Sequence, residues 1–425
     1  MMGTQAQTFE RASAMPAATW RFLGANDAQI EIPAGLSIQA GVKAEGNVRA
    51  GGADALDRAL ADAQAAWEAA HPAPTAAEEA ERAAYLAAEA DATYGGTALS
   101  AYQSGADALE GARSLAKAFE HGVGNEVAAY LRDVAGDCLL VKAENGQAAS
   151  AEVVVEAASQ AISVAAIDVV AEQGSTVDLS IVVDGPGAQP AGIAGTTVRI
   201  FAGEGARVNV ARTQTLGEGH ADIDDMALFA AEGAHIGVRQ TVLGASKSFT
   251  GLAGDLRGDF AHVSIDTRYL GMGDQERDFN YALRHHGRKT ESVMQANGVL
   301  AGESSKTLRG TIDLVRGCKG AEGSENETVL LVDEGVHNKT VPVILCNEDD
   351  VAGNHGATIG HIRNEQLFYL ASRGLSQAAA EAMFASAIVE QAALDADTSA
   401  ARSAVVRLGE RVAPGFAGLF EEEVG

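Results

Sequence analysis

A loose repeat of about 25 to 30 residues in the middle of the chain limits its possible folds more than any other feature. The stretches EQGSTVDLSIV, GEGARVNVART and AEGAHIGVRQT each place valine or isoleucine three residues after a glycine, with another apolar residue two positions further on. Val177, Val208 and Ile236 therefore lie 31 and 28 positions apart, and Val263 follows after another 27. Units this short cannot each bury an apolar face alone, but stacked units can, so the repeat predicts a solenoid.

The segments within each repeat have the pattern of β-strands. In STVDLSIVVDG, four apolar residues alternate with other residues and fall on one face of an extended chain: Val177, Leu179, Ile181 and Val183. Because no helical stretch separates the repeats, we expect a right-handed parallel β-helix. A β-sandwich, whose short strands are also separated by frequent turns, is the other fold that this pattern allows.

The distribution of residue types along the sequence divides the chain into three parts. Residues 1–135 are expected to be mostly helical, residues 136–350 to form the β-helix core, and residues 351–425 to form a C-terminal helical domain. The fold class is therefore mainly β, with a parallel β-helix between N-terminal and C-terminal α-helical domains. The N-terminal expectation depends on three Ala-rich runs of good helix formers, at residues 53–70, 75–92 and 108–123.

The C-terminal part carries helix boundary signals. Asn364 and Ser376 are in positions to cap the first turns of two helices, and Gly374 between them can end the first one. A last helix is expected before Pro414.

The charge of the chain argues against two classes of partner. It has 58 acidic and 31 basic residues, a formal net charge of −27. A field of that sign repels nucleic-acid phosphates and anionic lipids, so we expect neither nucleic acid nor membrane as a partner. The N-terminus has no apolar run typical of a signal peptide, and no stretch is apolar enough to span a membrane. We therefore expect a cytoplasmic protein.

The cysteines do not form a recognisable framework. Cys138, Cys318 and Cys346 are widely spaced and include no Cys-x-x-Cys pair. This spacing disfavours a set of disulfides or a four-thiolate metal site, and we expect buried, reduced thiols.

Three other patterns bear on chemistry. The stretch GHADIDDM places His220, Asp222 and Asp224 on one strand face, which suits either a metal or acid–base site or a polar face directed to solvent. The adjacent His285 and His286 would point to opposite faces of a strand, so they cannot hold one ligand together. No Gly-x-x-x-x-Gly-Lys-[Ser/Thr] motif is present, so the chain lacks a phosphate-binding loop of that kind.

His355 has a different setting. It follows the acidic run NEDD and precedes a turn of Gly, Ala and Thr that leads into the C-terminal helices. An imidazole there could ligate a soft or borderline metal, transfer a proton near neutral pH, or stabilise the turn.

The segment around His355 resembles the C-terminal signature of the SufB and SufD proteins, which belong to the SUF machinery for iron–sulfur cluster assembly. The likeness covers roughly residues 137–389. The matching elements are Asp350-Val351, His355-Gly356-Ala357-Thr358, Leu367-Phe368-Tyr369-Leu370 and Ser372-Arg373-Gly374, with Gly298-Val299-Leu300 and Gly310 upstream.

The resemblance implies a non-catalytic scaffold subunit with a right-handed β-helix between helical end domains. Such proteins pair through their β-helices and bind the ABC-type ATPase SufC, which hydrolyses ATP, through the C-terminal helices. In this chain, Phe368, Tyr369, Arg373 and Gly374 would belong to that docking region. Local core packing is the alternative role for Phe368 and Tyr369.

The resemblance also distinguishes two kinds of subunit. SufB-type chains carry a cysteine about 28 residues before the histidine of this turn and a glutamate directly after it, whereas this chain has Glu327 and Gly356. It therefore looks like the SufD-type partner, with His355 as its contribution to cluster assembly at the heterodimer interface. Many SufD-type chains also have a cysteine two residues before the histidine, where this chain has Gly353. Cys346 is a weaker candidate ligand.

No tightly bound cofactor is expected, only nascent iron or a nascent cluster at the interface with the partner subunit. When isolated, the chain could form a homodimer. Two alternatives remain: a homodimeric SUF scaffold without a separate SufB, and a β-helix carbohydrate-active enzyme such as a polysaccharide lyase or hydrolase. Glu327 argues against the first, since two copies would supply no thiolate there. The aromatic content of only 5% argues against the second, because few rings are available to stack on sugars.

Overall fold

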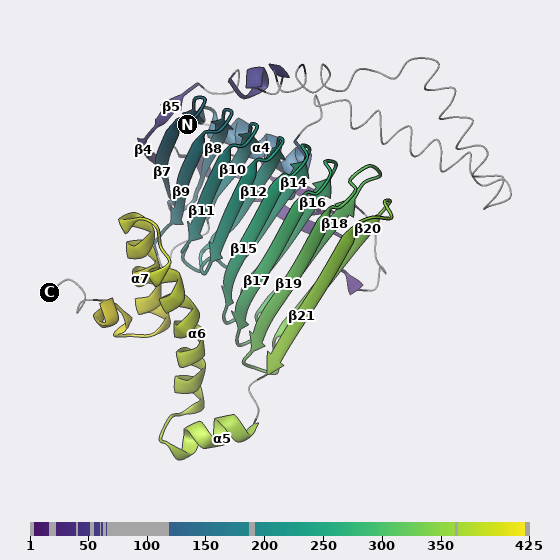
Figure 1. Ribbon diagram of the computed structural model, residues 1–425. Helices are drawn as coiled ribbons and strands as arrows, with labels where there is room; N and C mark the ends of the chain where they lie inside the picture. Colours follow the sequence, from purple (N-terminus) through teal and green to yellow (C-terminus); the bar gives the residue numbers. More distant parts are fainter. Residues whose placement is uncertain are drawn as a thin grey trace.

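The core of the protein is a β-solenoid (Figure 1). Sixteen strands, β6 to β21, wind with two strands per coil, which gives eight coils. The computed structural model describes residues 4–16, 23–39, 41–51, 55–59, 61–62, 65, 119–186, 192–361 and 364–420. Within them, the expected mainly β fold with a solenoid core is confirmed.

The two strands of each coil belong to two different parallel sheets. The first sheet contains β6 (Cys138–Ala143), β8 (Ala161–Ala171), β10 (Gly192–Ala202), β12 (His220–Ala230), β14 (Lys247–Leu256), β16 (Glu276–His285), β18 (Ser305–Leu314) and β20 (His337–Cys346). The second contains β7 (Ala148–Glu156), β9 (Thr176–Asp184), β11 (Arg207–Gln214), β13 (His235–Val242), β15 (His262–Gly271), β17 (Glu291–Leu300), β19 (Glu322–Leu331) and β21 (Ala352–His361).

The repeated residues of the sequence are register partners on successive strands of the second sheet. Val177 pairs with Val208, Val208 with Ile236, and Ile236 with Val263 on successive strands. All four side chains are fully buried in the main core cluster. Parallel in-register strands place equivalent residues on top of one another, so each coil buries the apolar face that the next coil presents.

The outer face of the first sheet is covered by N-terminal elements. Strands β1 (Gln7–Ala12) and β2 (Ala28–Ile32) form an antiparallel pair, and together with helix α4 (Asn125–Ala135) they bury an apolar cluster against the sheet. Residues 119–124, here called the strap, lead into α4. The strap is anchored by His121, which pairs with Asp225 of β12, and by Asn280, whose Nδ2 donates to the Gly122 carbonyl at 2.7 Å.

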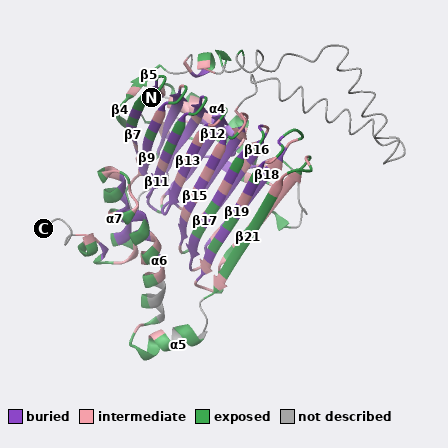
Figure 2. Cartoon of the chain, viewed as in Figure 1, coloured by how far each residue is buried: buried purple, intermediate pink, exposed green. Residues whose placement is uncertain are grey.

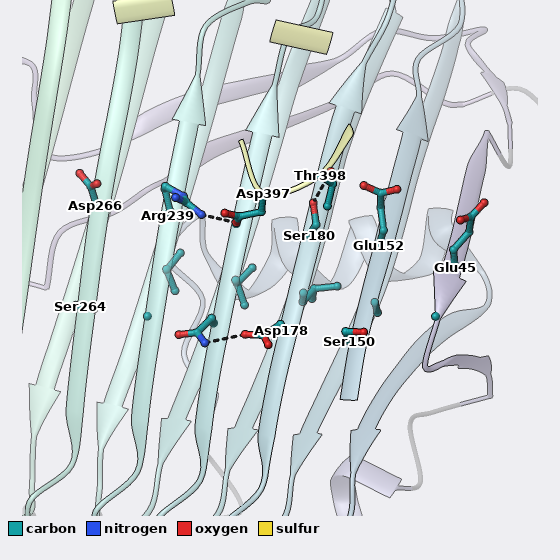
Figure 3. A pocket seen from close by; sticks show the side chains of 18 residues that line it. Glu45, Ser150, Glu152, Asp178, Ser180, Arg239, Ser264, Asp266, Asp397 and Thr398 are labelled. Carbon is teal, nitrogen blue, oxygen red and sulfur yellow. Dashed lines mark hydrogen bonds and ion pairs between the residues drawn. The ribbon is translucent and has the colours of Figure 1, made fainter. Parts of the chain in front are cut away.

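The outer face of the second sheet carries the C-terminal helices α6 (Gln377–Leu394) and α7 (Ser399–Val412). Figure 3 shows where the loop between them meets the sheet: Arg239 of β13 pairs with Asp397, and the hydroxyls of Ser180 and Thr398 lie 3.4 Å apart. A groove of about 780 Å³ opens beside this contact, over strands β7 to β15.

The two ends of the solenoid differ. At the first end, the antiparallel strands β4 (Val42–Gly46) and β5 (Val48–Ala50) pair with β7 and β6 and continue the two sheets. At the other end, β20 and β21 are the last strands of their sheets within the described residues. Figure 2 shows the consequence, because β21 is largely exposed and β20 is mostly of intermediate burial, whereas the earlier strands of the solenoid carry many buried residues. The solenoid therefore has one covered and one open end, here called the open end.

The N-terminal region differs from the helical expectation. Its described residues form β1, β2, β3 (Ser37–Ile38), β4 and β5, and helical turns only within 55–65 and in α4. The expected helix at 75–92 lies outside the described residues, as does the part of the third run before residue 119. Residues 119–123 are not helical, because they run against the sheet as the strap and make their hydrogen bonds to it.

The C-terminal boundary also needs correction. Strand β21 continues the solenoid to His361, 11 residues beyond the expected boundary at 350, because it pairs in register with β19 along its whole length. Helix α5 (Asn364–Ser372) begins after it. The cap at Ser376 is confirmed, since its side chain accepts from the Ala379 amide, and Gly374 has the positive φ of 88° expected after a helix end. Within the described part of the chain, no helix is long and apolar enough to cross a membrane.

Candidate functional site

His355 lies on the last strand of the open end. The sequence suggested a turn at this position, but residues 352–361 are a strand, and His355 is the register partner of Glu325 on β19. Register partners in a parallel sheet point to the same face. Glu325 is buried on the inner face of β19, so His355 occupies the inner face of the final coil, where the solenoid ends and the ring is exposed.

A cavity of about 640 Å³ adjoins His355. Its wall includes Glu325 from β19, Thr340 and Pro342 from β20, and Ile359 from β21. Ile359 is 51% exposed, although its register partner Val329 is buried in the core. The open end thus presents an interior surface, partly polar and partly apolar, that the next coil would cover in a longer solenoid.

A buried ion pair lies one coil below this cavity. Lys306 pairs with Glu327, and both side chains are almost completely buried. Glu327 also accepts hydrogen bonds from the Tyr269 hydroxyl at 2.7 Å and from Thr340. Burial lowers the pKa of Lys306, opposed by the charge of Glu327, and raises the pKa of Tyr269. Glu327 is therefore fully engaged in the packing of this chain.

Glu325 was not singled out by the sequence analysis. It is 5% exposed, and its buried Oε1 accepts no hydrogen bond from the part of the chain that the structure describes. Burial raises its pKa to about 7, and the nearby charge of Glu327 adds to the rise. Its carboxyl group lies against Gly310 of β18, where an added Cβ would come within 2.3 Å of the carboxyl carbon. In the sequence, Glu325 is visible as an acidic residue within a strand-like stretch. Whether its side chain points into the solenoid depends on the strand register, which the stretch alone does not define.

The three cysteines are all free. Cys318 is buried, and burial raises its pKa to about 12; Cys138 is partly buried, and burial raises its pKa to about 11. The expectation of burial is wrong for Cys346, which is exposed at the end of β20. Its Sγ lies 3.2 Å from the Glu348 carbonyl oxygen. It belongs to the same coil as His355 but is not among the residues that line the cavity.

The aromatic residues of α5 are surface residues. Phe368 is 76% exposed and Tyr369 is 55% exposed, so local core packing does not account for them. The guanidinium of Arg373 lies over the Tyr369 ring, 5.3 Å from its centroid. Figure 1 shows α5 past the C-terminal tip of β21, next to the lower end of α6.

The histidine and aspartates of GHADIDDM point inward, which corrects the view of a face directed to solvent. His220, Asp222 and Asp224 are fully buried. Arg212 of β11, also fully buried, donates to Asp222 at 2.6 Å and 3.2 Å and lies 2.9 Å from Asp224. The aspartates are thus held in an internal ion-pair network. Thr196 and Gln240 also donate to Asp224.

The two adjacent histidines do point to opposite faces, as the sequence indicated. His285 points inward, where its ring nitrogens contact Thr290 at 2.7 Å and Ser292 at 2.8 Å. His286 lies on the other side, 3.5 Å from Asp255. Burial lowers the pKa of His285 to about 4 and that of His286 to about 3. Both are therefore neutral near pH 7.

Asp224 predicts a pH dependence of stability. Burial raises its pKa to about 6, opposed by Arg212 and reinforced by Asp222. Between about pH 4 and pH 6 the folded protein therefore retains a proton that the unfolded chain has released, so stability falls as pH rises through this window. We expect a contribution of about 2–3 kcal/mol. Asp224→Asn should remove this part of the slope in urea unfolding measured from pH 4 to pH 7.

The asparagine variant is a fair test because Gln240 Oε1 has no hydrogen-bond partner among the described residues. The Gln240 amide can therefore rotate and accept from the new amide group of residue 224. Equal slopes for the variant and the unchanged protein would contradict the assignment to Asp224.

The comparisons with known proteins agree with this architecture. The family model described as SUF system FeS cluster assembly, SufBD core domain, matches residues 153–388. The iron-sulfur cluster assembly protein SufD of Bacillus subtilis is 30% identical over 127 residues, which are 30% of this chain and 29% of that protein. A SufBD family protein of Pyrococcus horikoshii is 30% identical over 148 residues, 35% of this chain and 33% of that protein.

A chloroplastic SufBD family protein of Arabidopsis thaliana is 23% identical over 220 residues, 49% of this chain and 39% of that protein. The alignments therefore span well under half the length of each of these three relatives. The family model matches more than half of this chain, however, and covers the coils that carry Glu325 and His355. By this match and by its β-solenoid fold, the chain belongs to the SufBD family of the SUF system for iron–sulfur cluster assembly.

Proposed function

We propose that this chain is a non-catalytic scaffold subunit of a SUF complex, of the SufD type. In this proposal it pairs with a SufB-type subunit, binds a SufC-type ATPase that hydrolyses ATP, and contributes His355 to the place where a cluster is assembled. The observation that carries the proposal is the position of His355, exposed on the inner face of the last coil at the open end.

The open end supports pairing with another solenoid. The free edges of β20 and β21 present backbone N–H and C=O groups that a strand of another chain can pair with. The exposed Ile359 and Leu23, which line the cavity beside His355, add apolar surface that a partner would bury. In this proposal that partner is a SufB-type subunit.

The ion pair of Glu327 supports a heterodimer over a homodimer. Glu327 is buried and bound to Lys306, so this chain offers an imidazole at the open end but no thiolate at position 327. Two copies of this chain would present two imidazoles. Cys346 does not line the cavity beside His355, so in this proposal a thiolate of the partner completes a ligand set suited to an iron–sulfur cluster.

The exposed rings of α5 support ATPase docking. Phe368 and Tyr369 are large apolar side chains on a surface helix, and aromatic residues of this kind are typical anchors of protein interfaces. Arg373, stacked on Tyr369, adds a directional charge beside them. We therefore assign α5 as the contact for the SufC-type subunit.

The first test is complex formation. The chain is mixed with SufB-type and SufC-type subunits from the same source, and the mixture is analysed by size-exclusion chromatography with light scattering. A stable complex containing all three supports the proposal. If this chain elutes alone or as a homodimer while the other two assemble, the pairing is contradicted, and a screen of carbohydrate substrates becomes the next experiment.

The second test concerns His355. Because the ring is exposed, His355→Ala should leave folding and complex formation unchanged but lower the yield of cluster in a reconstituted complex by about tenfold or more. The matched control is His361→Ala, which removes another exposed histidine from the same strand and should retain the full yield. Equal yields for the two variants would contradict the role of His355.

A further inference from the structure

Two buried oxygen atoms at the open end have no hydrogen-bond partner. Glu325 Oε1 and Asn338 Oδ1 are buried, and neither accepts a hydrogen bond from the described residues. Both residues line the cavity of about 640 Å³ that also contains His355. Buried polar atoms are almost always satisfied in folded proteins, so these two oxygen atoms need a hydrogen-bond donor or a cation in the cavity.

No neighbouring cation among the described residues forms an ion pair with Glu325. The one buried ammonium nearby, that of Lys306, pairs with Glu327 and donates to Thr340 at 3.0 Å. A carboxylate that is 5% exposed and has no ion pair is costly to keep in a folded protein. Gly310 nevertheless leaves room for it, because any Cβ there would meet the Glu325 carboxyl group within 2.3 Å. The glycine at position 310 of β18 therefore leaves space for the carboxyl group of Glu325.

The chemistry of the donors defines the ligand class. A carboxylate oxygen, an amide oxygen and an imidazole nitrogen suit a divalent first-row metal ion such as Fe²⁺, whose charge would also compensate Glu325. Glu325 and His355 are register partners on adjacent strands, so both project to the same face at a spacing of about 4.8 Å between strands. The described residues contain no group of three His, Cys, Asp or Glu side chains that could hold a metal alone. The set is therefore partial, with further positions for water or for a partner's side chain.

We infer that Glu325, together with Asn338, forms the oxygen side of a loading site for Fe²⁺ that it shares with His355. The inference rests on the proposed function, because it treats iron as the cargo of a cluster scaffold. In this site the ion would bind oxygen and nitrogen donors of this chain before it meets sulfur ligands. Glu325 is thus a second binding residue beside His355.

The test is anaerobic titration of the purified full chain, and of its complex with the partner subunits, with Co²⁺ followed by its visible absorption and with Fe²⁺ against a chromophoric chelator. Glu325→Gln keeps the shape of the side chain and breaks no ion pair, so it should unfold at the same temperature or higher. It should weaken Co²⁺ and Fe²⁺ binding by about tenfold or more. The further loss in a Glu325→Gln and His355→Ala double variant should be smaller than the sum of the single losses, because both act on one site.

Two further variants sharpen the result. Glu322→Gln makes the same charge change on the exposed outer side of β19 and should bind metal like the unchanged chain. Gly310→Ala retains every donor but should weaken binding because its Cβ displaces the Glu325 carboxyl group. Metal binding equal to that of the unchanged chain in Glu325→Gln, or no binding by both the chain and the complex, overturns the inference. Complex formation is read separately by light scattering, so failure of partner binding with intact metal binding contradicts only the proposed function.

Discussion

Replacing Arg212 with methionine should destabilise the protein by about 3–5 kcal/mol. Arg212, Asp222 and Asp224 are all fully buried, and the guanidinium is the only cation that contacts both carboxylates in the described interior. Methionine fills a similar volume but leaves two acids in the core without a cation in contact with them. Urea unfolding at pH 7 measures the loss. It should be smaller at pH 5, which is below the raised pKa of about 6 of Asp224.

The matched control for this variant is Arg207→Met. Arg207 lies on the same strand, β11, but is exposed, so its loss should change stability by less than about 0.5 kcal/mol. Neutralising the whole network, with Arg212→Met, Asp222→Asn and Asp224→Asn together, should recover part of the stability. Similar unfolding midpoints for Arg212→Met and Arg207→Met would show that the network does not hold the coils together.

Replacing Gly251 with alanine should destabilise the protein by about 3 kcal/mol or more. Gly251 is in β14, directly under the strap, and its Cβ would lie 2.1 Å from the Val123 nitrogen and 2.4 Å from the Gly122 carbonyl carbon. Both contacts are to backbone, so no side-chain rotation can relieve them. The strap would have to lift, which breaks the bond from Asn280 to Gly122 and leaves Asp225 without His121.

Gly237→Ala is the control for Gly251→Ala. Gly237 is also in a solenoid strand, β13, but its Cβ would meet only the side-chain oxygens of Asn209 at 3.4 Å and Ser264 at 3.6 Å, which are ordinary contacts. Its effect should be within about 1 kcal/mol, because alanine also reduces the entropy of the unfolded chain. Thermal unfolding compares stability, and limited proteolysis around residues 119–124 reports release of the strap. Equal protection in both variants would contradict the proposed clash.

The solenoid could be predicted from the sequence because its signal is local and repeated. Val177, Val208, Ile236 and Val263 recur at almost one coil length, and the structure places them in register. The helix caps were predictable for a similar reason, since Ser376 and Gly374 act within one turn of their own position.

Features that depend on register were harder to predict. A shift of one residue in strand pairing would decide whether Asp222, Asp224 and Glu325 point inward or outward. The alternation of residues in a polar stretch does not define that register. The structure places all three inside, where Arg212 satisfies the first two and no described residue satisfies the third. His355 was recognised through its family motif, but its strand conformation follows from pairing with β19 along ten residues.

The two ends of the solenoid offer different strand edges to another chain. Strands β4 and β5 run antiparallel to their neighbours and are the outermost strands at the first end, whereas β20 and β21 leave the other end open. Association of two like chains through β20 and β21 joins the open end of one solenoid to the open end of the other. The antiparallel strands β4 and β5 of both chains then face outward at the two far ends of the pair.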